Sequence, residues 1–161
     1  MAADILLKID GVEGDSKVGG HIGEIDVLSA SFGAVNASSR AYGGGGGTSK
    51  VSVQDLMITK RADKASPDLF LKTCDGTHYD SAKLTFRKAG GTGGAVDYLA
   101  YEMTNVFISS WQQSGGGDQF AMETIGMSFE KVKVTFIPQD EKGKGVEPVE
   151  VEWDIAANQK P

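Results

Sequence analysis

The sequence predicts a mainly all-β protein, a small β-barrel with one short flanking α-helix. Three observations support this prediction. Apolar and polar residues alternate along most of the chain, glycines gather between the alternating runs, and only one segment carries helix start and stop signals. We expect a single domain over residues 1–161, because this length suits one hydrophobic core and no linker or internal repeat divides the chain.

The alternating runs mark the expected strands, because successive side chains of a strand point to opposite faces. The residues expected to face the core are, in chain order, Ile5, Leu7 and Ile9; Leu28, Ala30 and Phe32; Ala82, Leu84 and Phe86; Ile125, Met127 and Phe129; Val132, Val134 and Phe136; and Val149, Val151, Trp153 and Ile155. The alternation changes phase at residues 54–55, which indicates a bulge or a bend. Val96–Trp111 is apolar on both faces, so it is expected to form two strands or one long bent strand. The chain thus contains about eight strands.

The last two runs carry charges on their outer faces. Lys131 and Lys133 make one face basic, whereas Glu150 and Glu152 make the other acidic. If these two strands pair, opposite charges face one another, and each such pair contributes at most about 1 kcal/mol.

The one predicted helix begins near Ser66 and ends before Gly76. Ser66 is a favoured N-cap residue, Pro67 suits the first helical position, and Gly76 is a common residue just after a helix. The side expected to face the protein carries Leu69, Phe70, Thr73 and Cys74. Cys74 is therefore interpreted as a buried structural thiol.

Composition excludes several classes of function. The formal net charge of −6 argues against nucleic-acid binding, which needs a basic face. The single cysteine rules out an internal disulfide framework and fits synthesis in a reducing cytoplasm. The N-terminus lacks the basic region and long apolar run of a secretory signal, and no window approaches the roughly 20 apolar residues of a membrane helix. A secreted protein of this kind needs another export route.

We find no motif for catalysis, a cofactor or a metal. The five consecutive glycines are followed by Thr48, Ser49 and a strand, whereas a phosphate-binding loop needs a lysine and then a helix. Cys74, His78 and His21 offer only a weak zinc set, without paired ligand motifs. The carboxylates show no pocket that would tune an acid and a base. The sequence therefore predicts a protein that is not an enzyme.

Two segments are candidates for contact with other molecules. If Leu28 and its alternate neighbours face the core, the outward side chains of the second strand are Val27, Ser29 and Ser31. These residues are uncharged and form either an ordinary exposed strand or the wall of a shared channel. The glycine-rich segment is either a flexible loop between strands or an arm that orders on another subunit; its residues are Tyr42, Gly43, Gly44, Gly45, Gly46, Gly47 and Thr48.

Several sequence blocks, in one consistent order, resemble the haemolysin co-regulated protein family, the tube subunit of bacterial type VI secretion. The blocks are DILLKIDGVEGDSK (Asp4–Lys17), EIDVL (Glu24–Leu28), GGGGGTSKVSVQDLMITKRADKASPDLFLKTCDGTHY (Gly43–Tyr79), AKLTFRKAGG (Ala82–Gly91), VFISSW (Val106–Trp111), FEKVKVTFIPQ (Phe129–Gln139) and EWDIAAN (Glu152–Asn158). They cover nearly the whole chain.

The resemblance implies a β-barrel akin to phage tail-tube proteins. It also implies homohexameric rings that stack into a tube inside a contractile sheath, with a spike protein at the tip and small effector proteins in the lumen. Such a protein is made in the cytoplasm and exported by the type VI machine without a signal peptide. The resemblance favours reading the glycine-rich segment as an arm that reaches a neighbouring subunit or ring. It implies no nucleic-acid or membrane partner.

This chain departs from the family pattern at two places. The tryptophan-rich second strand of the family is only partly kept, with Ala30 and Phe32 in place, and the glycine usual before the late Trp-Asp pair is Glu152. These changes leave the cargo preference open. The alternative hypothesis is a monomeric β-barrel that binds a small ligand inside, since barrels of eight strands can enclose one.

Overall fold

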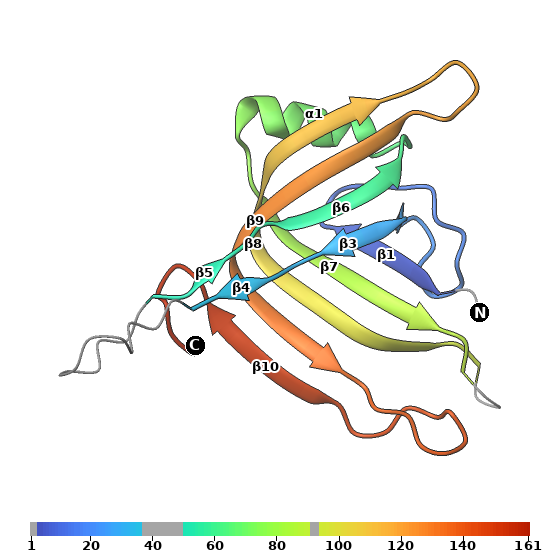
Figure 1. Cartoon of the computed structure of the whole chain (residues 1–161), viewed down its shortest axis with the longest axis vertical. Helices are drawn as coiled ribbons and strands as arrows, with labels where there is room; N and C mark the ends of the chain where they lie inside the picture. The colour runs from blue at the N-terminus through green and yellow to red at the C-terminus, as the bar shows by residue number, and fades with distance from the viewer. Residues whose placement is uncertain (1–2, 37–49, 91–93) are drawn as a thin grey trace.

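The computed structural model describes residues 3–36, 50–90 and 94–161, and it confirms the predicted fold class (Figure 1). Eight strands form a nearly closed, barrel-like sheet in the order β2-β1-β7-β8-β9-β6-β3, and β10 pairs with β9. The elements are β1 (Asp4–Ile9), β2 (Ile25–Val27), β3 (Ser29–Ser31), β4 (Ala34–Val35), β5 (Ser52–Val53), β6 (Leu56–Arg61), α1 (Ser66–Asp75), β7 (Tyr79–Lys88), β8 (Val96–Ser114), β9 (Met122–Phe136) and β10 (Val149–Asp154).

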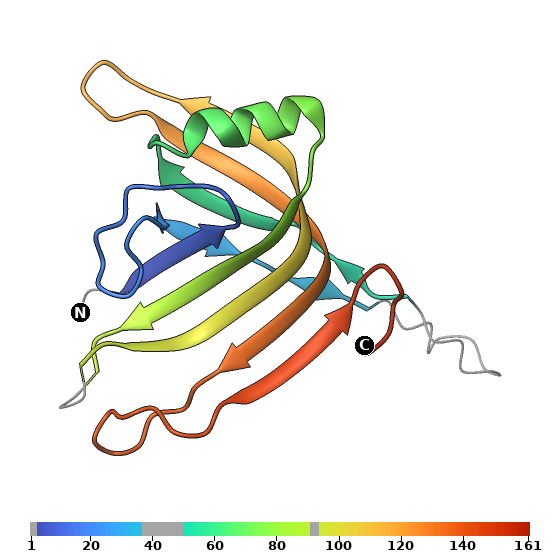
Figure 2. The same ribbon diagram turned by 180° about the vertical axis from the view of Figure 1, so that it is seen from behind.

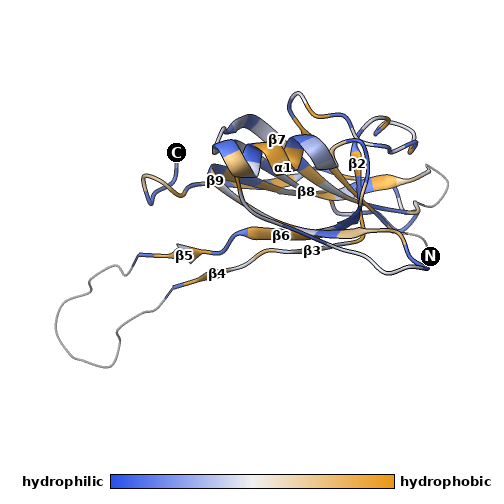
Figure 3. Cartoon of the chain, turned by 90° about the horizontal axis from the view of Figure 1, so that it is seen from above, coloured by the Kyte–Doolittle hydropathy of each residue, from blue (hydrophilic) through white to orange (hydrophobic). Residues whose placement is uncertain are grey.

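The hydrophobic core lies between two layers of this sheet. Seen from above, β3 and β6 form one layer, and β7, β8 and β9 form the other, with α1 on their side (Figure 3). From behind, α1 lies across the end of the long strands (Figure 2). The side chains that fill the space are fully buried aliphatic residues, among them Leu7, Leu84, Met103, Ile108 and Ile125.

Strands β8 and β9 are long and change faces halfway along. The inward residues of β9 are Ile125, Met127 and Phe129 in its first half and Val132 in its second half, which breaks the period of two. Opposite this break, Asn105 of β8 has a positive φ of 53°. Both strands are distorted at the same place, so their pairing continues in register. Beyond this place, the other set of alternate residues faces the core. The two alternating runs in the sequence are therefore halves of one strand.

The phase predicted for the second strand is wrong at its start. Val27 is buried against the core, and Leu28 is about half exposed. The reason is that the strand is interrupted at Leu28, which separates β2 from β3. The backbone N–H of Leu28 donates to the carbonyl of Thr59. A one-residue break reverses the alternation. Ser29 and Ser31, which follow the break, are exposed as predicted.

The helix forms where the sequence predicts it, but two of its residues play other roles. Ala65 is the N-cap, and Ser66 is the first helical residue, with its hydroxyl turned into the protein. Gly76 ends the helix in the left-handed conformation, as expected. Cys74 is exposed, so the expectation of a buried thiol is wrong. Leu69 alone anchors the helix in the core, which leaves the next turn on the surface. Within the described residues, no helix is long and apolar enough to cross a membrane.

Strand β10 pairs with β9 as the charge pattern suggests. Glu152 lies opposite Lys133 in the register, and the Lys133 ammonium lies 3.3 Å from the Glu150 carboxylate. However, Val149 and Val151 are exposed rather than half-buried. The opposite layer of the barrel ends before it reaches them.

Candidate functional site

An uncharged polar band crosses the outer face of four strands. Its members lie opposite one another in the registers of β3, β6, β9 and β8. One row consists of Ser29, Thr59, Thr124 and Gln112, and the next of Ser31, Met57, Gly126 and Ser110. The β6 side chains at the ends of the band are charged, since Asp55 precedes the strand and Arg61 closes it. The band is therefore a neutral surface with charges only at its margins. Most of its side chains are small, and Met57 and Gln112 are the two longer ones.

Gly126 keeps the middle of this band flat. A Cβ atom at this position would lie 2.5 Å from the Ser110 hydroxyl and 3.1 Å from the Met57 sulfur. Neighbouring side chains thus pack over the glycine. The band is a closely fitted wall rather than a pocket, which suits sliding contact better than tight binding of one ligand.

The outer face of the other layer is chemically different. One row of residues runs across five strands, through Lys8, Lys83, Glu102, Lys133 and Glu152. Within this row, Lys133 forms an ion pair with Glu102 at 3.7 Å, whereas Lys8 and Lys83 carry like charges at facing positions. The hydrogen bond that the Lys133 ammonium donates to the Glu150 carboxylate, and then the negative charge of that carboxylate, raise the pKa of Lys133. The molecule therefore has one neutral face and one charged face.

The structure places the predicted site residues as follows. Ser29 and Ser31 lie together in the neutral band, whereas Val27 belongs to the core. The glycine-rich segment lies outside the described residues. Its base is described: β4 and β5 pair there, with Ala34 opposite Val53, and this ribbon extends beyond the barrel (Figure 3).

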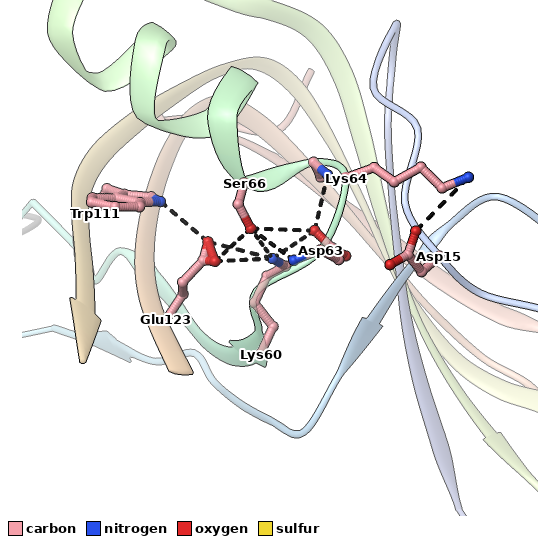
Figure 4. A network of polar contacts seen from close by, with 8 residues as sticks. Asp15, Lys60, Asp63, Lys64, Ser66, Trp111 and Glu123 are labelled. Carbon is pink, nitrogen blue, oxygen red and sulfur yellow. Dashed lines mark hydrogen bonds and ion pairs between the residues drawn. The ribbon is translucent and has the colours of Figure 1, made fainter. Parts of the chain in front are cut away.

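A buried network of charges lies beneath α1, and the sequence analysis missed it. Lys60 of β6 and Glu123 of β9 expose no side-chain surface, and the Lys60 ammonium lies 2.8 Å from Asp63 and 3.4 Å from Glu123 (Figure 4). The Glu123 carboxylate also accepts hydrogen bonds from the Ser66 hydroxyl, at 2.5 Å, and from the Trp111 indole, at 3.3 Å. These contacts join β6, α1, β8 and β9.

The sequence does contain a signal for this network. Lys60 follows Leu56 and Ile58 at a spacing of two, and Glu123 precedes Ile125 at the same spacing. Each charged residue therefore occupies an inward position of its strand. Because both side chains are sealed from solvent, the network holds the barrel end together and offers no reactive group to a substrate.

A second polar cluster fastens the loop after β1 to the long strands. The ring nitrogens of His21 lie 2.7 Å from Glu24 and 2.9 Å from Asp97, and Arg87 donates to both Asp97 and the Gly19 carbonyl. Partial burial opposes ionisation of Asp97, but the hydrogen bonds from Arg87 and His21 hold its pKa below the usual range. This cluster is structural, since every group is engaged by a neighbour.

The weak zinc set does not assemble. Cys74 is on the exposed side of α1, His78 contacts Asn105, and His21 is held by two carboxylates. No group of three or more metal-ligating side chains occurs among the described residues.

One apolar hollow among the described residues is an open groove rather than an enclosed cavity. It measures about 330 Å³ and lies at the base of the β4–β5 ribbon, between Phe32, Val51 and Trp153. Inside the barrel, Phe32 packs against Tyr101 and Phe129, with ring centroids 5.5 and 5.7 Å apart. Beside these rings lies another hollow of about 260 Å³, which is lined by inward residues that include Leu56, Leu84 and Phe86 and is open to solvent on one side.

Comparison with known proteins identifies close relatives. Residues 6–136 match the family described as type VI secretion system effector, Hcp. Protein hcp1 of Pseudomonas aeruginosa is 43% identical over 160 residues, which cover 98% of each chain. Among solved structures, a type six secretion system protein superposes with a TM-score of 0.90 at 30% identity, over 99% of this chain and 100% of that one. Hcp1 from Salmonella typhimurium gives a TM-score of 0.79 at 32% identity, over 100% of both chains.

Proposed function

The chain belongs to the Hcp family of type VI secretion system proteins, and on this premise we propose that it is a subunit of the secretion tube. Six copies form a homohexameric ring, rings stack into a tube that is expelled, and the ring lumen carries small effector proteins. The family consists of structural secretion proteins, so the subunit has no catalytic task.

The neutral band on β3, β6, β9 and β8 is the observation that carries this proposal. A channel wall that must let proteins pass needs small, uncharged side chains, because charged or deeply pocketed walls would hold the cargo. The band meets this requirement, whereas the opposite face, with its row of charged residues, does not. We therefore assign the band to the lumen, with Ser29 and Ser31 in its wall.

Family membership supports the remaining partners of this proposal. The contractile sheath surrounds the tube, and a spike protein covers its tip. We propose that the residues from Tyr42 to Thr48, which lie outside the described residues, contact the next subunit or the next ring. The subunit is synthesised in the cytoplasm and exported by the machine itself, without a signal peptide.

Mass photometry or sedimentation velocity of the purified protein tests the proposal. We expect a dominant species of six protomers at micromolar concentration, and rings with a central hole in electron micrographs. A protein that stays strictly monomeric at tens of micromolar would contradict the ring and, with it, the lumen.

A further inference from the structure

The hollow of about 260 Å³ lies between β3 and β6 on one side and β7 and β8 on the other. Leu56 and Leu84 line it and are almost completely buried. Phe86 and Tyr101 line it as well, and both pack against the core while remaining partly exposed. The hollow therefore reaches from the surface into the apolar interior, as the binding pockets of small molecules do.

Three aromatic rings stand at this hollow, and their spacing suits contact with a further ring. The centroid of the Tyr101 ring lies 5.5 Å from that of Phe32 and 6.2 Å from that of Phe86, and both pairs meet edge to face. Aromatic rings prefer this arrangement at centroid distances of about 4.5–7 Å. A ring that enters beside them can extend the cluster, so the wall favours an aromatic ligand over an aliphatic one.

The mouth of the hollow is polar. Ser31 is the exposed residue among those that line it, so the opening lies on the β3 side. Ala30, Ser31 and Phe32 are consecutive, and alternate side chains of a strand point to opposite faces, so the backbone itself forms part of the wall. Among the described strands, β3 ends the sheet and pairs with β6, and its other edge carries backbone groups without a strand partner.

A side-chain hydroxyl is free at the same place. The Tyr101 hydroxyl forms no hydrogen bond with any described residue. The hydroxyl of a buried tyrosine usually has a partner. This hydroxyl and the free edge of β3 are therefore polar groups that a ligand in the hollow can engage.

We propose that the hollow binds a small aromatic molecule that carries one hydrogen-bonding group, such as an indole or a phenol. The ring lies against Phe32, Phe86 and Tyr101, and the polar group bonds to the Tyr101 hydroxyl or to the β3 backbone. Pockets for drug-sized ligands measure about 300–1,000 Å³, and this one is smaller, so it suits a molecule of about one or two fused rings. Ser31 also belongs to the neutral band, so the mouth adjoins that band. All of these residues come from one subunit, so the inference goes beyond the proposed ring and does not depend on it.

Titration of the native protein with indole, followed through its methyl signals in two-dimensional NMR spectra, tests the site. We expect saturable shifts for Leu56 and Leu84 and none for Leu28, which lines a different hollow. Cyclohexanol has a hydroxyl but no aromatic ring, so it should bind about tenfold more weakly. Unshifted Leu56 and Leu84 signals would overturn the site, and equal affinities for the two compounds would overturn its preference for aromatic ligands.

Two variants with matched controls locate the ligand. Ala30→Leu fills the hollow and should abolish indole binding, whereas Ala34→Leu makes the same change in the open groove at the β4–β5 ribbon and should not. Tyr101→Phe removes only a hydroxyl and should weaken binding by about tenfold, whereas Tyr98→Phe makes the same change on β8 outside the hollow and should leave it unchanged. Native affinity in both Ala30→Leu and Tyr101→Phe would overturn the proposal.

Circular dichroism with thermal melting verifies that each variant is folded. If Ala30→Leu fails to fold, the Tyr101→Phe pair and the methyl shifts still decide the question. Sedimentation velocity of the same samples reports the ring separately. Indole binding by a native protein that forms no ring would contradict the proposed function and support this inference.

Discussion

Lys60 and Glu123 are cross-strand partners in β6 and β9, and neither side chain is exposed to solvent. An ion pair withdrawn from water must be satisfied completely, because each buried charge loses its hydration. Here the ammonium reaches two carboxylates and a hydroxyl, while the Glu123 carboxylate receives the Ser66 hydroxyl and the Trp111 indole. The network fixes where α1 begins relative to the barrel.

Replacing Lys60 with methionine should destabilise the fold strongly. The change leaves Asp63 and Glu123 buried without a cation, and breaking one partner of a buried pair costs about 3–5 kcal/mol. Urea unfolding of the dissociated protomer measures the loss. Lys64→Met is the control: Lys64 is mostly exposed, so the same change should alter stability by less than about 0.5 kcal/mol.

A double-mutant cycle separates the pair from packing effects. Glu123→Gln removes a buried carboxylate charge that Lys60→Met leaves without a cation. The double variant should therefore be more stable than the sum of the two single changes predicts. Strict additivity would show that the two residues do not interact.

Gly14 is expected to tolerate no side chain. A Cβ atom there would lie 2.5 Å from the Glu24 carbonyl oxygen and 2.8 Å from the Ile25 Cα, and backbone atoms cannot move aside cheaply. Gly14→Ala should therefore reduce the unfolding free energy by about 1–3 kcal/mol, as overpacking does elsewhere. Gly19→Ala in the same loop is the control, because no atom lies within 4 Å of its Cβ position. Equal melting temperatures for the two variants contradict the predicted clash.

Asp97 should make stability depend on acid pH. Its pKa is lower in the folded protein than in the unfolded chain, so its stabilising effect is complete above the unfolded value of about 4 and disappears as pH falls through the folded value. The gap in unfolding free energy between the native protein and Asp97→Asn should be constant near neutral pH and narrow below about pH 4. The effect is modest, because Asp97 is partly exposed. A gap that does not change with pH contradicts this assignment.

The fold class and helix position followed from local patterns, and the errors arose where tertiary contacts override those patterns. Alternation predicts which residues share a face only while the strand is regular. The break at Leu28 reversed it, so Val27 is buried. In β8 and β9, the distortion at Asn105 changes the phase of the alternation. The sequence pattern therefore indicated two strands where the structure has one. Neither irregularity contains a proline, and neither has a glycine to signal it.

Exposure also depends on what covers a strand. The alternation of Val149 and Val151 predicts a half-buried strand, yet a single copy leaves both exposed. Cys74 has helical spacing from Phe70, but the buried residues of α1 are Ser66 and Leu69, so the last turn, which contains Cys74, stays on the surface. The exposure of Ser29 and Ser31 could be predicted from the alternation along the strand, and their place in a channel wall stays a prediction. The other residues of the neutral band could not be identified from the sequence, because their position depends on the register of four strands.

Ser31→Gln tests whether the neutral band is the lumen wall. The longer side chain would project into the channel and should reduce co-purification of small effector proteins with the rings by about tenfold, or about 1.4 kcal/mol. Ser81→Gln makes the same change on the charged outer face, where Ser81 lies opposite Thr104, and should leave cargo unchanged. Both variants should form rings, which sedimentation verifies, since both serines are exposed in β-strands. Cargo retained equally by both variants would place Ser31 outside the lumen, because a longer side chain in a channel wall should lower cargo binding and one on the outer face should not.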